Sequence, residues 1–278
     1  MNTILVPTDF SQEASHALKL AVEIAKKNNA EIKLLHVIES TGGASFSTTG
    51  GDADSGIDDI YTLKLMQKAK QDLHTTAQAA GYDQISTDVD VGSPYSRIAR
   101  DIAEHNVDLV VMGSKGVSGL EETFVGSNAE IVVRRADCPV ITVKSPASLE
   151  GLKSIVFAGA FEKDTPQVAD RLKKLQALLG AQLHLVKVNT PYEFQSDREI
   201  KKAMKGFADR HGLENYSMHI YSSRDEEDGI IYFAEDNDMD MIALATHGRT
   251  GLMHLLSGSI AEDVVNHAKR PVWTCKIA

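Results

Sequence analysis

A glycine-rich segment that occurs twice is the feature of this sequence that most limits how the chain can fold. In the first copy, the apolar residues 109–112 precede a series of glycines that includes Gly116 and Gly126. The second copy contains Gly248 and Gly258, so that both pairs of glycines are separated by 132 positions (248 − 116 and 258 − 126). A repeat at constant spacing predicts two copies of one module in this chain.

Each copy has the order of elements that binds phosphate in α/β proteins. The apolar residues 109–112 predict a buried strand, and the residues after Gly126 have helical periodicity. Glycines let the backbone approach an anion closely and adopt positive φ. The first amides of a helix have no partner within it and carry about half a positive charge. We therefore expect an anion-binding loop after this strand.

Length and charge limit the classes of function. A chain of 278 residues with 42% hydrophobic and 24% charged residues is typical of a globular protein with two domains. The net charge of −10 argues against nucleic acid as a partner, although a single nucleotide needs only a local pocket. No apolar run reaches about 18 residues, and residues 1–4 lack the pattern of a signal peptide. These observations predict a cytoplasmic protein without a membrane partner.

The only two cysteines, Cys138 and Cys275, occupy equivalent positions near the ends of the two copies. Neither belongs to a CxxC pair or has a histidine nearby in the sequence. We therefore predict reduced, buried thiols and no metal site.

Alternating strand and helix patterns predict two tandem, doubly wound, parallel α/β sheets of five strands each. The expected limits are 1–144 for a first domain with the complete motif, 145–153 for a linker and 154–278 for a second domain with a degenerate motif. The predicted strands span 2–7, 31–37, 86–91, 108–112, 139–144, 154–158, 182–188, 217–221, 240–245 and 272–276. The predicted helices span 60–80, 94–104, 128–135, 166–179, 196–211, 226–235 and 260–268, and a further helix follows Ser11 as its N-cap.

The two copies differ mainly by one insertion. Val6 aligns with Phe157 at an offset of 151, whereas the glycines align at 132, and the difference of 19 matches the segment 40–58. This segment is rich in Gly, Ser, Thr and Asp and has no periodicity, which predicts a long polar loop. The sequence leaves open whether this loop is a lid over the ligand or a disordered connection.

Three matched segments in the right order resemble the universal stress protein family, in its tandem form. The first is the opening segment 4–11 (ILVPTDFS), and the last is the segment 138–140 (CPV). Between them lies a glycine motif, in which two residues separate Gly113 from Gly116 and nine residues separate Gly116 from Gly126-Ser127. The resemblance covers nearly the whole chain. It implies a Rossmann-like fold of the adenine nucleotide alpha hydrolase type.

The resemblance also implies that the first copy binds ATP, ADP or AMP, with or without Mg²⁺. Asp9 would bind the ribose hydroxyls, and the backbone of Val37 would meet the adenine edge. The implied binding residues are Pro7, Thr8, Asp9, Val37, Met112, Gly113, Ser114, Gly116, Gly126, Ser127 and Asn128, of which the last four would hold phosphates. No catalytic residue and no metal ligand are predicted.

The second copy departs from this pattern at two positions. Ala160 replaces the ribose acid, and Ala245 replaces the first glycine, while Gly248, Gly258 and Ser259 remain. Loss of a charge-assisted hydrogen bond costs about 1.5–3 kcal/mol. We therefore expect weak ATP binding, or another ligand, in the second copy. The sequence leaves open whether its glycines serve only to start a helix.

Several of these residues also have a purely structural explanation. Asp9 is suited to stabilise a helix N-terminus. Lys115, His247 and Arg249 are equally consistent with solvated loop side chains, and His36 is more typical of a strand end than of catalysis.

Three functions remain open from the sequence. A nucleotide-dependent regulator of the stress response is favoured, because the glycine pattern is not the GxxxxGK[ST] loop and no general base is evident near it. The alternatives are a slow ATPase or nucleotide hydrolase, and a scaffold without a working site. The resemblance further implies that residues 140–144 and 272–276 pair as an internal pseudo-dimer, and it leaves a homodimer open.

Overall fold

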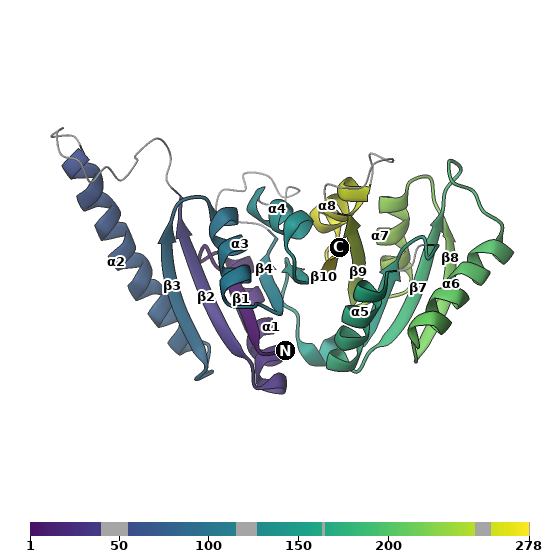
Figure 1. Ribbon diagram of the computed structural model, residues 1–278, viewed down its shortest axis with the longest axis horizontal. Helices are drawn as coiled ribbons and strands as arrows, with labels where there is room; N and C mark the ends of the chain where they lie inside the picture. Colours follow the sequence, from purple (N-terminus) through teal and green to yellow (C-terminus); the bar gives the residue numbers. More distant parts are fainter. Residues whose placement is uncertain (40–54, 115–126, 163–164, 248–256, 278) are drawn as a thin grey trace.

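The computed structural model describes residues 1–39, 55–114, 127–162, 165–247 and 257–277. Figure 1 shows the first copy and the second copy side by side, with α4 of the first next to α8 of the second. Residues 40–54 of the predicted loop 40–58 lie outside the described residues. Residues 55–58, which were also predicted as loop, are helical.

All ten strands form one continuous sheet with the order β3-β2-β1-β4-β5-β10-β9-β6-β7-β8. Neighbouring strands are parallel except β5 and β10, which are antiparallel. The strands are β1 (Thr3–Pro7), β2 (Glu31–Ile38), β3 (Ile85–Val91), β4 (Leu109–Gly113), β5 (Val140–Val143), β6 (Ser154–Ala158), β7 (Gln182–Asn189), β8 (Tyr216–Ser222), β9 (Met241–His247) and β10 (Val272–Ile277). The two predicted five-stranded parallel arrays are thus joined edge to edge.

Helices cover both faces of this sheet in the same way in each half. One buried cluster contains residues of α1, α2, α5 and α6, and the other contains residues of α3, α4, α7 and α8. The helices are α1 (Gln12–Asn28), α2 (Ser55–Ala79), α3 (Pro94–Glu104), α4 (Ser127–Arg135), α5 (Pro166–Leu179), α6 (Asp197–His211), α7 (Glu226–Asp236) and α8 (Ser257–His267), with a short 3-10 helix η1 (Leu149–Gly151) between the halves.

Local capping explains where several helices begin. Ser11 accepts a hydrogen bond from the Ala14 amide and caps α1, as predicted. Ser196 and Glu199 form a capping box at the start of α6. Each cap satisfies amides that the helix itself leaves without partners, so these boundaries follow from short sequence patterns.

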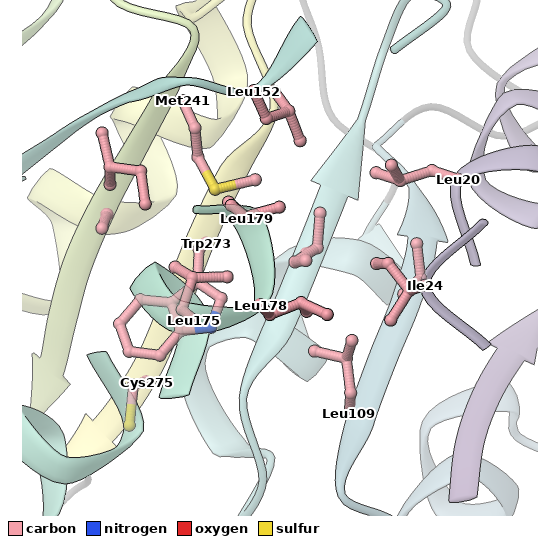
Figure 2. Packing of buried hydrophobic residues seen from close by; sticks show 14 of the residues in the cluster. Leu20, Ile24, Leu109, Leu152, Leu175, Leu178, Leu179, Met241, Trp273 and Cys275 are labelled. Carbon is pink, nitrogen blue, oxygen red and sulfur yellow. The ribbon is translucent and has the colours of Figure 1, made fainter. Parts of the chain in front are cut away.

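The halves meet where β5 and β10 pair. Ile141 lies opposite Trp273, which confirms the expected pairing of the last strands within one chain. Trp273 is fully buried, and Figure 2 shows it near Leu175 and Leu178 of α5. Leu178 extends toward Ile24 of α1, so apolar side chains from both halves form one core across the junction.

Both cysteines are free and buried, as the sequence predicts. Burial raises the pKa of the Cys138 thiol to about 12, so this group is protonated at neutral pH. Among the described residues, no helix combines the length and apolar character needed to cross a membrane.

Candidate functional site

The strand order reverses direction between β1 and β4 in the first half. From β1 the chain proceeds outward through β2 and β3, whereas β4 and β5 lie on the other side of β1. In open α/β sheets, ligands bind beyond the carboxyl ends of the strands at such a reversal. The predicted residues Pro7, Val37 and Met112 lie at the carboxyl ends of β1, β2 and β4, so the fold brings these segments to one edge of the sheet.

The turn after β1 holds Asp9 at the start of α1. The Thr8 amide donates to the Leu35 carbonyl of β2 at 2.8 Å, and the Ser11 amide donates to Asp9 Oδ1 at 3.0 Å. Phe10 has a positive φ of 64°, which turns the chain sharply between these two contacts. The carboxylate is therefore held in one place at a helix N-terminus, next to the reversal point.

His36 supports the same turn from β2. Its Nδ1 donates to the Thr8 carbonyl oxygen at 2.8 Å, and its ring lies 4.6 Å from that of Phe10. This agrees with the structural explanation of His36 that the sequence favoured over a catalytic one.

Gly113 at the end of β4 touches the first turn of α1. A Cβ atom at this position would lie 2.9 Å from Glu13 Cβ and 3.0 Å from the Ala14 amide nitrogen. Glycine is therefore needed to let α1 start beside β4. The counterpart of Gly113 in the second half is Ala245 (245 − 113 = 132). Helix α5 begins at position 166, which aligns with position 15 of the first half (166 − 151), whereas α1 begins at position 12. The helix therefore starts three positions later in the second half.

We expect Gly113→Ala to lower the free energy of unfolding by about 1–3 kcal/mol, because the new methyl group must displace backbone. The matched change Ala245→Gly should cost less than about 1 kcal/mol, which is the ordinary cost of glycine in a strand. Urea denaturation of both variants measures the difference. Equal losses would show that the start of α1 does not determine the residue at position 113.

Buried hydroxyl groups precede the glycine segment in both halves. Ser114 and its counterpart Thr246 (246 − 114 = 132) are each 1% exposed. Neither hydroxyl oxygen has a hydrogen-bond partner among the described residues. A buried hydroxyl without a partner is costly, so these two atoms are positioned to accept or donate a bond at the edge where the glycine segments follow.

The start of α4 lies at the same edge. Asn128 Nδ2 donates to Glu39 Oε1, just beyond β2, at 3.1 Å. Ser127 is the first residue of α4, as the sequence approximately predicts. The predicted phosphate ligands Gly116 and Gly126 lie outside the described residues. The structure thus brings together seven of the eleven predicted positions by the ends of β1, β2 and β4, and it places Ser127 and Asn128 at the start of the facing helix.

The second half keeps the backbone of this site. The Gly159 amide donates to the Val186 carbonyl oxygen at 3.2 Å, as its counterpart Thr8 does to Leu35. Phe161 has a positive φ of 62°, as its counterpart Phe10 has, and both pairs are 151 positions apart. Its side chains differ. Ala160 has no carboxylate, and Lys187 occupies the position of His36 (187 − 36 = 151).

Lys187 is a buried cation that sequence analysis did not identify. It is 4% exposed, and its Nζ lies 3.3 Å from Glu226 Oε1 and 3.9 Å from Glu193 Oε2. Glu193 lies in the segment after β7, and its backbone amide donates to Thr190 Oγ1 at 3.3 Å. The alignment of Lys187 with His36 was a usable signal, but the position of its carboxylate partners depends on the fold.

Helix α7 also packs closely against the end of β7. A Cβ atom on Gly229 would lie 2.5 Å from Val188 Cγ1, so only glycine allows this approach. The counterpart of Gly229 in the first half is Arg97 (229 − 132), which extends to the Val91 carbonyl oxygen at 2.8 Å. As a result Val188 is 4% exposed, whereas its counterpart Val37 is only partly buried. The strand end that should meet adenine is therefore more accessible in the first half.

Comparison with known proteins agrees with this duplicated architecture. A putative universal stress protein of Staphylococcus haemolyticus is 29% identical over 168 residues, covering 58% of this chain and 94% of that protein. One from Staphylococcus aureus is 34% identical over 150 residues, covering 51% of this chain and 83% of that protein. The crystal structure of a universal stress protein from Archaeoglobus fulgidus matches with a TM-score of 0.72 and 24% identity, covering 100% of this chain and 99% of that one.

The last of these similarities extends over both halves and confirms the predicted Rossmann-like α/β fold. The sequence profile described as "Universal stress protein family" matches residues 1–144 and again residues 151–276. The two matched segments together cover nearly all of the chain. This chain therefore belongs to the universal stress protein family, with one matched segment in each half.

Proposed function

We propose that this chain is a nucleotide-dependent regulator that binds ATP in its first half. The observation that carries the proposal is the position of the Asp9 carboxylate. It is held by the Ser11 amide at the start of α1, beside the point where the strand order reverses and next to the accessible end of β2. A fixed acid at the end of a strand is suited to the two ribose hydroxyls of a nucleotide.

The other parts of the nucleotide have matching positions in the proposal. The backbone of Val37 meets the adenine edge, and Met112 and Gly113 line the ribose. The phosphates lie on the loop that contains Gly116 and Gly126 and on the first amides of α4, at Ser127 and Asn128, where the helix dipole favours negative charge. The Ser114 hydroxyl directly follows β4, is buried and has no partner among the described residues, which supports a polar ligand near this strand end. Mg²⁺ bound with the nucleotide would offset part of the negative charge of the phosphates.

Binding is proposed to be asymmetric between the halves. The second half lacks a carboxylate at Ala160, and its strand end is covered by the contact between Val188 and Gly229. Glu193 and Glu226 lie by Lys187 at the end of β7, where the first half has the uncharged contact of His36 with the Thr8 carbonyl oxygen. One ATP per chain is therefore the expected stoichiometry.

Regulation follows from binding, because a ligand shifts a conformational equilibrium by its difference in affinity for the two states. ATP at a hundredfold excess over its dissociation constant would also add about 2.7 kcal/mol to the free energy of unfolding. This contribution gives a second readout of binding that does not depend on any downstream partner.

Calorimetric titration of the full chain with MgATP tests the proposal. We expect one site per chain and an affinity that falls about ten- to hundredfold in Asp9→Ala, since a charge-assisted hydrogen bond is lost. Asp88→Ala is the matched control, because it removes the same charge from an exposed position on β3. The thermal unfolding temperature of each variant without nucleotide checks that the fold is intact.

Two outcomes would contradict the proposal. Two equivalent sites would remove the asymmetry, and unchanged affinity in Asp9→Ala would remove the assigned role of the carboxylate. Release of ADP above the protein-free rate, abolished by Asp9→Ala, would instead favour the hydrolase hypothesis.

A further inference from the structure

A cavity of about 890 Å³ lies at the end of the sheet opposite the proposed nucleotide site. Its lining comes from the amino ends of the central strands and from the helices that meet at the junction of the halves. Leu109 is the first residue of β4, Pro139 precedes β5, and Lys27 and Leu178 belong to α1 and α5. Its volume is within the range of about 300–1,000 Å³ that small organic ligands occupy.

Apolar side chains form about half of the cavity wall, and polar groups form the rest. Trp273, which is 1% exposed, forms part of it, and Figure 2 shows Leu175 and Leu178 near this side chain. Leu109 also lines the cavity. Further apolar lining residues include Met1, Ile102, Val107, Cys138, Pro139 and Ala177. Such a surface favours a ligand with a hydrocarbon or aromatic body.

Three cations lie around this apolar wall. Lys27 Nζ donates to the Leu178 carbonyl oxygen, and Arg171 donates to the Asp137 carbonyl oxygen at 2.9 Å, so both have uncharged acceptors. Lys174 is exposed on α5. Within the part of the chain that the structure describes, no carboxylate lies within 4.0 Å of the charged nitrogens of these three residues.

The acids at the cavity already have partners. Asp137 pairs with Lys276 at 2.8 Å, and Asp108 accepts hydrogen bonds from the amides of Asn2 and Thr3. Lys27, Arg171 and Lys174 outnumber Asp108, the described lining acid that has no printed cationic partner, so the cavity has an excess of positive charge in a chain of net charge −10.

This arrangement depends on the tandem organisation. At the offset of 151, the counterparts of Arg171 and Lys174 in the first half are Leu20 and Glu23, and the counterpart of Lys27 is Leu178. A symmetric dimer of a single copy would repeat the same residues on both sides of the axis. Only two different copies in one chain place Lys27 opposite Arg171 and Lys174.

We infer that this junction cavity binds an amphipathic anion, a molecule with an apolar body and one acidic head group such as a medium-chain fatty acid anion. The body would lie against Trp273 and the leucines of the wall. The carboxylate would lie between Lys27, Arg171 and Lys174. This ligand differs in chemistry and location from the nucleotide, so the two sites can be tested separately.

Trp273 supplies the signal, because it is the only tryptophan in the chain and lines the cavity. We would titrate the full chain with decanoate and follow tryptophan fluorescence, with acetate, decanol and decyltrimethylammonium in parallel. A saturable change with decanoate, at least about tenfold tighter than with decanol or the cationic analogue, is expected. Acetate should have no effect, and the decanoate affinity should fall with added salt.

Two variants separate the charge from the volume. Lys174→Glu should weaken decanoate binding about tenfold, whereas Lys202→Glu, the same change on an exposed part of α6, should leave it unchanged. Ala177→Phe should weaken decanoate and decanol alike, because it fills the cavity. MgATP binding should be unaffected in all three.

Equal affinities for decanoate, decanol and the cationic analogue would overturn the inference, as would unchanged binding in Lys174→Glu. A fluorescence change that does not saturate would show non-specific partition instead of a site. Each of these outcomes can occur whether or not the chain binds ATP.

Discussion

Replacing Trp273 with alanine is expected to lower the free energy of unfolding by about 3–5 kcal/mol, the usual cost of deleting a buried aromatic side chain. Trp273 is 1% exposed and lies opposite Ile141 in the pairing of β5 with β10. Its removal leaves a void at the junction core, where Leu175 and Leu178 lose their contacts.

The same substitution should also uncouple the halves. Residues of both halves share one cluster that includes Trp273, so the native chain should unfold in a single transition. Urea denaturation followed by far-UV circular dichroism should show a lower midpoint in Trp273→Ala, with a broadened or biphasic curve. Tyr192→Ala is the control, since Tyr192 is 83% exposed and its loss should change stability by less than about 0.5 kcal/mol. A loss below about 1 kcal/mol in Trp273→Ala would show that the junction does not stabilise the fold.

Replacing Lys33 with methionine is expected to cost about 3 kcal/mol of stability, because it leaves the Asp101 carboxylate buried without its cation. The side chain of Asp101 is 2% exposed, and Lys33 Nζ lies 3.5 Å from its Oδ2, which has no hydrogen bond among the described residues. The same Lys33 nitrogen contacts His105 Nε2 at 2.9 Å. A buried carboxylate without a positive partner is costly, whereas an apolar residue at the same place is not.

The double variant Lys33→Met with Asp101→Leu should therefore recover most of the loss. The second half has an apolar residue at one of these two positions, since Phe233 occupies the position of Asp101 (233 − 132 = 101), while His184 occupies that of Lys33 (184 − 151 = 33). Lys205→Met is the matched control, because its pair with Asp209 is more than half exposed and screened by solvent, so its loss should change stability little. No recovery in the double variant would mean that Lys33 stabilises the protein by packing and not by charge.

Short-range patterns predicted most of the elements correctly. The limits of β6 and α5 agree with the prediction to the residue, and Ser11 caps α1 as expected. These features depend on alternation, helical periodicity and capping, which involve residues close together in the chain. The start of α2 was predicted five residues too late, at position 60 in place of Ser55, because the polar composition before it is typical of a loop.

The candidate site was predicted in part for a similar reason. Repeated spacing identified the strand ends and the glycine segment, and parallel strands necessarily bring their carboxyl ends to one edge. Lys187 and Gly229 were missed, because their roles depend on contacts with Glu226 and Val188 that are distant in sequence. The Asp101–Lys33 pair was missed in the same way.

The residue order thus specified a duplicated α/β chain, the offsets between its copies and the loss of the acid at Ala160. These properties are carried by identity and spacing along the chain. The folded arrangement established that the halves share one sheet, that Gly113 is required by the first turn of α1, and that a cavity bordered by cations lies at the junction. Such features arise where side chains from separate segments meet, and no local pattern records which segments those are.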